Sequence, residues 1–304
     1  MGNALSFIPP IEITPARLTA SNIPMPDTAV GEAEWLVGTT YALGARVIVS
    51  ADRTLYESLQ AGNTGKSPAT NPTWWVKVSA CNRYRMFDTV NSSQSTRSSL
   101  IDVTITPSAI VNSLALLNIA AQTVRVRMND AIDGLVFDQT FALQATPLQS
   151  TWWNYYFDPI ESKTDLFVAL PSYRSATIRV EITSTGTAAC GAFLLGSAIP
   201  IGDGVEYGAS LGIQDYSRKE RNEFGDIVLV ERSFTKRANY RMLVPNGSRP
   251  SINRLLAQNR AKPSLWIGVE GQEDTYIYGV YKDYQFIIEF TEHSVLTLDL
   301  EGLT

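Results

Sequence analysis

Short runs that alternate apolar and polar side chains recur through the middle of this sequence. Successive side chains of a β-strand point to opposite faces of its sheet, so alternation with a period of two predicts a strand with one buried face. The clearest runs are Leu100–Ile105, Thr123–Met128 and Ala176–Ile182, and turn residues such as Asp133-Gly134 separate them. Repeated short strands of this kind predict an antiparallel, jelly-roll-like β-sandwich over residues 80–204.

The segment from Ser108 to Ala121 does not alternate. It contains no glycine or proline and is rich in leucine, isoleucine and valine. Such a pattern fits one helix as well as two strands, because a continuous apolar run has no diagnostic period.

The first 30 residues are dominated by prolines, which are excluded from helix interiors and disfavoured in central strands. We therefore predict an extended arm over residues 1–30. Its stretch Phe7–Ile13 is apolar, which indicates that the arm packs along a surface of this chain or of a neighbour.

Residues 205–304 have a different pattern, which predicts a C-terminal α+β assembly domain. One helix is expected over Ser251–Arg260, since Pro250 precedes it, Pro263 follows it and its apolar positions have helical spacing. Strands are expected at Ile227–Arg232, Tyr240–Val244, Leu265–Val269, Tyr276–Tyr281, Tyr284–Phe290 and Val295–Leu300. The whole chain is thus predicted to be mainly β and multidomain.

Charge and hydropathy argue against two classes of partner. The 304 residues carry a formal net charge of -5, which does not favour nucleic acid, whose phosphates need clustered lysine and arginine. No window is long and apolar enough to insert into a membrane, and the first residues do not resemble a signal peptide.

Catalytic side chains are scarce. His293 is the single histidine and is expected in a solvated turn. Zinc sites and Ser-His-Asp triads depend on positioned histidines, so neither is expected here. Cys81 and Cys190 are expected to be reduced, buried thiols, with one disulfide as the alternative. We predict no enzyme, no cofactor and no bound metal.

Residues 31–79 form a small module with strands expected at Ala45–Ser50, Leu55–Leu59 and Trp74–Val78. The stretch from Trp35 to Val47, then Tyr56, the loop Asn63–Pro68 and the closing Trp74–Val78 resemble a chitin-type carbohydrate-binding module. That resemblance implies a small β domain that stacks sugar rings on exposed aromatic faces, formed by Trp35, Tyr41, Trp74 and Trp75.

Two observations leave the sugar platform open. A domain this small must also bury aromatic side chains to fold, and we expect Tyr56 and one of Trp74 and Trp75 to lie in its core. The chain also departs from the family pattern, with Ala45 where an acidic residue is usual and Leu59-Gln60-Ala61 where ligand-stacking aromatics are usual.

The densest aromatic cluster is Trp152–Phe157. On a strand its side chains divide between two faces, so one set can fill a core. The side chains on the other face are predicted to contact a neighbouring subunit, with ligand binding as the alternative.

A second resemblance spans nearly the whole chain. The stretch Tyr207–Glu220 with Phe224-Gly225 resembles a family of tail proteins of tailed bacteriophages. Further stretches agree with that family in order along the chain: Ala16–Pro24, Asn82–Asp88, Thr187–Gly191, Ser233–Arg237 and Leu300–Thr304.

This resemblance implies a structural protein of the virion, in the tail or baseplate, and fixes neither its partner nor its ligand. The small domain would either contact host-surface glycan during adsorption or simply decorate the particle. We expect assembly in the host cytoplasm, other tail proteins as partners and a symmetric homo-oligomer. The alternative is a free, lectin-like glycan-binding protein with no assembly role.

Overall fold

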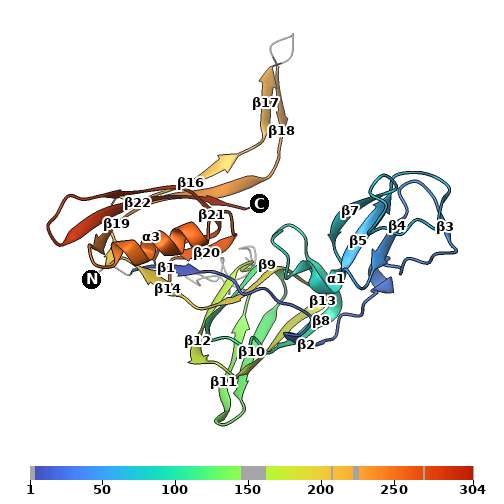
Figure 1. Cartoon of the computed structure of the whole chain (residues 1–304), viewed down its shortest axis with the longest axis horizontal. Coiled ribbons are helices and arrows are strands. Elements are labelled where there is room, and N and C mark those ends of the chain that lie inside the picture. Colours follow the sequence, from blue (N-terminus) through green and yellow to red (C-terminus); the bar gives the residue numbers. More distant parts are fainter. Residues whose placement is uncertain (1–3, 145–161, 207, 222–225, 270, 304) are drawn as a thin grey trace, which may run out of the picture. The chain divides into compact units, whose positions relative to one another are not determined.

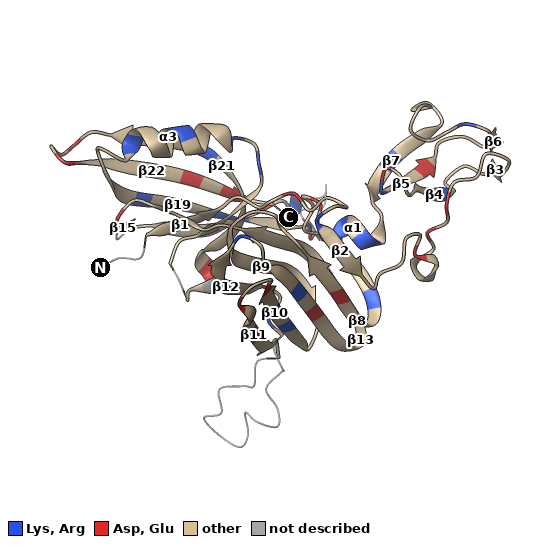
Figure 2. Cartoon of the chain, turned by 60° about the horizontal axis from the view of Figure 1, so that its bottom comes forward, with Lys and Arg blue, Asp and Glu red and all other residues tan. Residues whose placement is uncertain are grey.

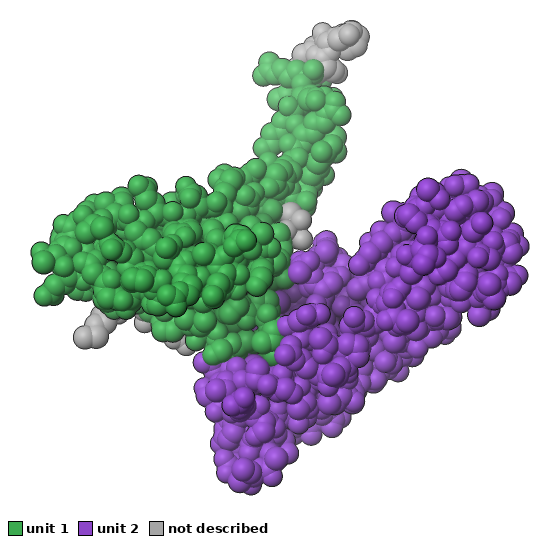
Figure 3. Space-filling view, viewed as in Figure 1, with its two compact units in different colours: residues 1–11, 195–304 green, residues 12–194 purple. Residues whose placement is uncertain are grey.

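The computed structural model describes residues 4–144, 162–206, 208–221, 226–269 and 271–303. The chain is mainly β, with several antiparallel sheets and a few helices, as predicted (Figure 1). It divides into two compact units, one of residues 12–194 and one of residues 1–11 with 195–304 (Figure 3). None of the described helices is both long and apolar enough to cross a lipid bilayer.

The larger sheet of residues 12–194 has seven strands in the order β11-β10-β13-β8-β2, and β9 pairs with both β13 and β12. The strands are β2 (Leu18–Ser21), β8 (Ser95–Ile105), β9 (Val111–Ala120), β10 (Thr123–Asp130), β11 (Gly134–Ala142), β12 (Leu166–Tyr173) and β13 (Thr177–Gly196). The alternating runs identified in the sequence lie in β8, β10 and β13.

The two faces of this sheet carry the two halves of the alternation. Buried apolar side chains on β8, β9, β10 and β13 form the core, and they include Ile101, Val103, Leu114, Leu116, Val124, Val126, Ile178 and Val180. The polar positions of β8, β10, β11 and β13 form ion pairs between neighbouring strands, visible as alternating blue and red in Figure 2. These pairs are Arg125–Asp138, Arg127–Glu181 and Arg179–Asp102.

The segment whose type the sequence left open is the single strand β9. Most of its side chains are buried, on both faces of the strand. A strand buried on both faces has no polar side to alternate with, which explains the missing period.

The small module contains β3 (Thr40–Tyr41), β4 (Arg46–Val49), β5 (Thr54–Ser58), β6 (Asn63–Thr64) and β7 (Trp75–Ala80). β4, β5 and β7 form a three-stranded antiparallel sheet, and β3 pairs with β6. Its core residues include Val47, Ile48 and Leu55, from the predicted strands.

A buried polar network, which we call the joint, links the module to the larger sheet. It comprises Asp27, Glu32, Asn82 and Ser95, each at most 3% exposed. Asn82, at the start of α1 (Asn82–Arg85), donates from its side chain to Asp27 (2.7 Å) and from its backbone to Glu32 (2.6 Å). Asn82 also exchanges hydrogen bonds with the backbone of Thr96 on β8. The entry segment, which includes the 3-10 turn η1 (Thr28–Val30), is thereby fixed to both α1 and β8.

Residues 1–11 and 195–304 form an eight-stranded antiparallel sheet in the order β14-β1-β20-β21-β22-β19-β15, with β16 also paired to β19. Its strands are β1 (Leu5–Ile8), β14 (Ile199–Ile201), β15 (Gly204–Val205), β16 (Ser210–Asp215), β19 (Phe234–Pro245), β20 (Ser264–Ile267), β21 (Tyr276–Ile287) and β22 (His293–Gly302). A short 3-10 turn, η2 (Glu273–Thr275), precedes β21.

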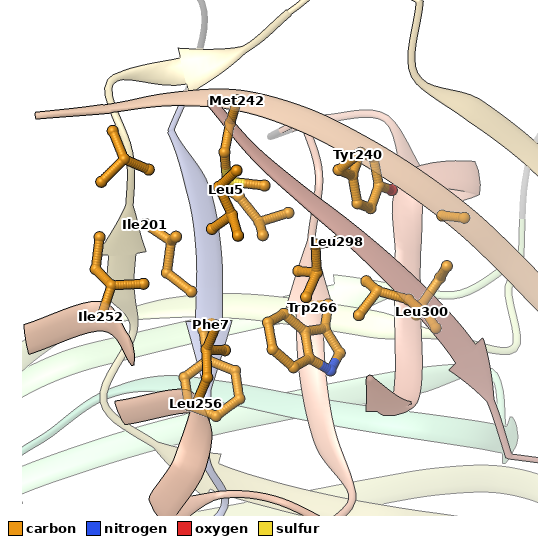
Figure 4. Close-up of a cluster of buried hydrophobic side chains, with 14 residues drawn as sticks. Leu5, Phe7, Ile201, Tyr240, Met242, Ile252, Leu256, Trp266, Leu298 and Leu300 are labelled. Atoms are coloured by element: carbon orange, nitrogen blue, oxygen red, sulfur yellow. The ribbon is translucent and has the colours of Figure 1, made fainter. Parts of the chain in front are cut away.

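The ten-residue helix α3 (Arg249–Gln258) packs on this sheet, close to its predicted position. Its Ile252 and Leu256 join Phe7, Trp266 and Tyr240 in one apolar core (Figure 4). Asn259 ends the helix by donating to the Leu255 carbonyl from its backbone and its side chain.

Three sequence expectations require comment. Residues 1–30 are not one arm, because β1 is an inner strand of the eight-stranded sheet while β2 pairs with β8 in the other unit. The two strands expected at 276–281 and 284–290 are the single strand β21, which carries a register shift at Tyr281/Asp283. Such a bulge interrupts the alternation and so looks like a strand break in the sequence.

His293 begins β22 and its ring lies 3.4 Å from the Asp203 carboxylate, where a solvated turn was expected. Cys81 and Cys190 are both free and buried. The Trp152–Phe157 cluster lies outside the described residues.

Candidate functional site

Trp75 belongs to the core of the small module. It is 2% exposed, and its indole nitrogen donates to the Lys66 carbonyl (2.8 Å). The Tyr41 ring lies edge-on to it, with centroids 5.3 Å apart and planes at 70°. Trp75 is therefore the tryptophan of the Trp74/Trp75 pair that packs inside.

Tyr41 is half-buried and has a structural task of its own. Its hydroxyl accepts a hydrogen bond from the Leu36 amide (2.8 Å), which holds the loop between residues 36 and 41. Because its ring is nearly perpendicular to that of Trp75, these two side chains do not form a flat platform.

Trp74 is half-buried, like Trp35 and Tyr41. The Lys66 ammonium lies 5.8 Å from the centre of its ring, within the range of a cation–π contact. The turn before Trp74 is rigid, since Asn71 caps it by donating to the Ser67 carbonyl (2.9 Å). One face of the Trp74 ring therefore has the Lys66 cation over it.

Trp35 is also half-buried, and its backbone amide donates to the Ile48 carbonyl (2.9 Å). Its indole nitrogen is buried, with no hydrogen-bond partner in the described part of the chain. Nearby in the sequence, Leu36, Val37 and Leu43 are 60%, 67% and 68% exposed. The module therefore presents an apolar loop around Trp35 and Tyr41.

The structure adds a residue to the module that the sequence did not point to. Asn63 is fully buried, and its side chain donates to the Ser58 hydroxyl (2.9 Å) while its Oδ1 has no partner among the described residues. A polar residue on a two-residue strand gives no periodic signal, so only the fold identifies it.

A groove of about 570 Å³ lies in the unit of residues 12–194, between the module and the segment formed by α1 and the residues that follow it. Its lining combines carboxylates with cations and a partly buried ring, and includes Asp52, Arg53, Lys77, Phe87 and Asp88. The sequence drew attention to the Asn82–Asp88 stretch only through its resemblance to tail proteins.

Burial changes the acidity of several groups around this groove. It raises the pKa of Asp88 to about 6, although the carboxylate accepts a hydrogen bond from the Val90 amide (2.7 Å). Burial also raises the pKa of Tyr84, whose ring has the Arg53 guanidinium 5.3 Å from its centre. It raises the pKa of Cys81 to about 11, so this thiol is not a nucleophile at neutral pH.

Among the described residues, no group of three or more histidine, cysteine, aspartate or glutamate side chains is placed to hold a metal ion. The groove and the module thus offer hydrogen bonds, charges and aromatic faces, which are the means of binding a polar ligand.

No model of a known protein family matches the chain, and no curated protein matches it. Among solved structures, a mutant of chitosan-binding module 1 from a chitosanase/glucanase of Paenibacillus sp. IK-5 is similar over 38% of this chain and 83% of its own length. The identity is 9% and the TM-score 0.26, which is too low to support any argument.

Proposed function

We propose that this chain is a structural component of a tailed-phage virion, placed in the tail or at its baseplate or tip. Assembly takes place in the host cytoplasm, and the neighbours are other tail proteins and further copies of this chain. The role needs no catalytic step.

The main support is a hairpin formed by β17 (Arg218–Arg221) and β18 (Ile227–Val230). From here on, the arm means this hairpin and not the N-terminal segment of residues 1–30. It is a separate two-stranded sheet, and every residue of its strands is exposed. The four aliphatic side chains of β18 are 44–69% exposed. A hairpin that packs on nothing is marginally stable, and contiguous exposed apolar surface is typical of an interface, so the arm is suited to a neighbour.

The sequence supports the same segment. The stretch Tyr207–Glu220, which resembles phage tail proteins, includes most of β17, and the matching stretch Ser233–Arg237 follows β18. The segments that resemble the family thus include and follow the exposed hairpin.

Glycan contact is the second part of the proposal. We assign contact with host-surface polysaccharide to the half-buried aromatic side chains of the module, Trp35, Tyr41 and Trp74, the last with the Lys66 cation over its ring. Trp75 contributes only by packing in the core of the module, since it is 2% exposed.

Labelling of intact particles tests the virion role. We expect antibodies raised against this chain to decorate one defined position on purified tails in electron micrographs, and mass spectrometry of the particles to detect it. Particles that lack the chain, or a purified chain that releases sugar from polysaccharide, would contradict the proposal. A monomer that binds polysaccharide and is absent from particles would support the lectin-like alternative.

Pull-down on chitin and on host-surface polysaccharide tests the glycan contact. Trp74→Ala should lower binding about tenfold or more without changing the melting temperature, because stacking contributes on the order of 1–2 kcal/mol. Val76→Ala, two residues further along the chain on β7 and 43% exposed, is the matched control and should bind normally. If Trp74→Ala binds as well as the wild type, these side chains are not a sugar site.

A further inference from the structure

The two faces of the arm differ in charge. In the pairing of β17 with β18, Lys219 lies opposite Leu229 and Arg221 opposite Ile227. Directly paired residues share a face, so one face carries Ile227 and Leu229, 59% and 69% exposed, together with two cations. We call this the basic face of the arm.

The other face is neutral within itself. It carries Val228 and Val230 with Glu220 and Arg218, and the last two form an ion pair at 2.5 Å. The basic face has less internal compensation among the described residues, where Lys219 pairs with Asp215 at 2.8 Å and Arg221 has no ion pair. The basic face is thus the one that offers both apolar surface and charge to a partner.

A second exposed apolar surface lies in the turn of residues 288–292 between β21 and β22, which we call the acidic turn. Ile288 and Phe290 are 66% and 54% exposed, and Glu289 and Glu292 belong to the same turn, whose backbone is red at these acidic positions in Figure 2. The turn is held in shape by Asn246, whose side chain donates to the Thr291 carbonyl (2.9 Å). Glu289 has one cation near it, Arg241 at 3.5 Å.

The arm and the acidic turn lie at opposite ends of β19. Phe234, at one end, pairs with Asp215 next to the arm, and Pro245, at the other end, pairs with His293 next to the turn. Twelve residues of strand separate the two ends by roughly 35 Å. Figure 1 shows the arm extending from the end of the sheet away from the turn, so the arm does not cover the turn of its own chain.

We propose that the basic face of the arm docks on the acidic turn of a second copy of this chain. Ile227 and Leu229 would pack against Ile288 and Phe290, while Arg221 and Lys219 face Glu292 and Glu289. The charges are opposite in sign, and both surfaces are apolar at their centres, as interfaces are.

The contact joins two different surfaces, so it is heterologous and each copy retains a free arm or a free turn for the next copy. Repetition produces a closed ring or an open filament. This assembly surface goes beyond the proposed virion role. It is tested by self-association of the purified chain, whereas the virion role is tested by labelling of intact particles.

A mixing experiment on the full chain tests the proposal by sedimentation velocity. Wild type should form oligomers at tens of micromolar, whereas Leu229→Asp, which damages the arm, and Phe290→Asp, which damages the turn, should each be monomeric. An equimolar mixture should form dimers and no larger species, because one intact arm and one intact turn remain. Val228→Asp, on the neutral face, is the matched control and should associate like wild type.

A milder pair guards against damage to folding. Arg221→Glu and Glu292→Arg should each weaken association about tenfold, and a mixture of the two should recover part of it. Wild type that stays monomeric, or Leu229→Asp and Phe290→Asp that do not associate when mixed, would overturn the proposal, as would a loss of association in Val228→Asp equal to that in Leu229→Asp. Oligomers that form equally well in Leu229→Asp, Phe290→Asp, Arg221→Glu and Glu292→Arg would also overturn it, because the contact would then lie elsewhere.

Discussion

The joint and the arm both depart from the usual rule that apolar side chains are buried and polar ones exposed. The joint buries polar groups, whereas the arm exposes apolar ones. The joint buries two carboxylates and an asparagine, and the arm exposes four consecutive aliphatic side chains. In the joint every polar group named above has a hydrogen-bond partner within the chain, from Asn82 to Asp27, Glu32 and Thr96. In the arm the apolar side chains of β18 are not packed against other described residues and are 44–69% exposed.

This difference separates what stabilises the chain from what the chain offers to others. A buried polar network whose members are all satisfied fixes one arrangement of the segments it joins, so the joint is internal architecture. An exposed apolar hairpin adds little to the stability of the isolated chain, and it is the surface that we propose for an external contact. Mutations in the two regions should therefore change different measurements.

The largest effect is expected in the joint. Asn82→Ala should lower the free energy of unfolding of the unit of residues 12–194 by about 3 kcal/mol, because it removes one side-chain donation to the Thr96 carbonyl and another to Asp27, whose buried carboxylate then loses its side-chain donor. Asn129→Ala, an exposed asparagine on β10 of the same unit, should cost less than about 0.5 kcal/mol. Denaturant unfolding measures both, and equal losses would show that the joint is not a special source of stability.

A smaller, pH-dependent effect is expected at Asp88, which lies near the joint but lacks its hydrogen bonds. Its pKa is raised to about 6 by burial, so the folded state holds its proton more tightly than the unfolded state. Wild type therefore loses stability relative to Asp88→Asn as pH rises through the window between the ordinary aspartate pKa and the raised one.

We expect the stability advantage of Asp88→Asn to grow by about 1 kcal/mol between about pH 4 and pH 7, a value reduced for partial exposure of the carboxylate. Unfolding curves at the two pH values provide the test. An advantage that is constant or shrinks with pH would mean that the carboxylate is not disfavoured in the folded chain.

The smallest effect on stability is expected in the arm. Leu229→Ser should change the free energy of unfolding of the monomeric chain by less than about 0.5 kcal/mol, since this side chain is 69% exposed. The same variant should weaken self-association measurably. Leu298→Ser, on the buried part of β22, is the contrasting change and should destabilise the chain strongly. A Leu229→Ser variant that unfolds as easily as Leu298→Ser would place the arm in the core and remove the distinction.

How much the sequence could predict depended on whether the signal was local. The alternation in β8, β10 and β13 and the prolines around α3 are local signals, and the elements they predict are present. β9 has no alternation because it is buried on both faces, and β21 seemed to break because of its bulge. Local patterns carry no information on either cause.

Long-range pairing was beyond the reach of the sequence. Nothing near Leu5–Ile8 indicates that these residues enter a sheet between β14 and β20, because their partners lie almost 200 residues or more away. The same holds for the joint, in which Asp27 meets Asn82. In the module the aromatic positions were evident, but which of Trp74 and Trp75 is buried depends on the register of β7 with β5.

Hydrogen exchange measured on the free chain and on the assembled protein tests the central claim most directly. The account predicts that the amides of Ile227–Val230 exchange rapidly in the free chain and become strongly protected on assembly, while amides of the joint, such as that of Asn82, are protected in both states. Equal exchange of the arm in the two states would contradict it, because the exposed aliphatic strand would then have no partner to explain it.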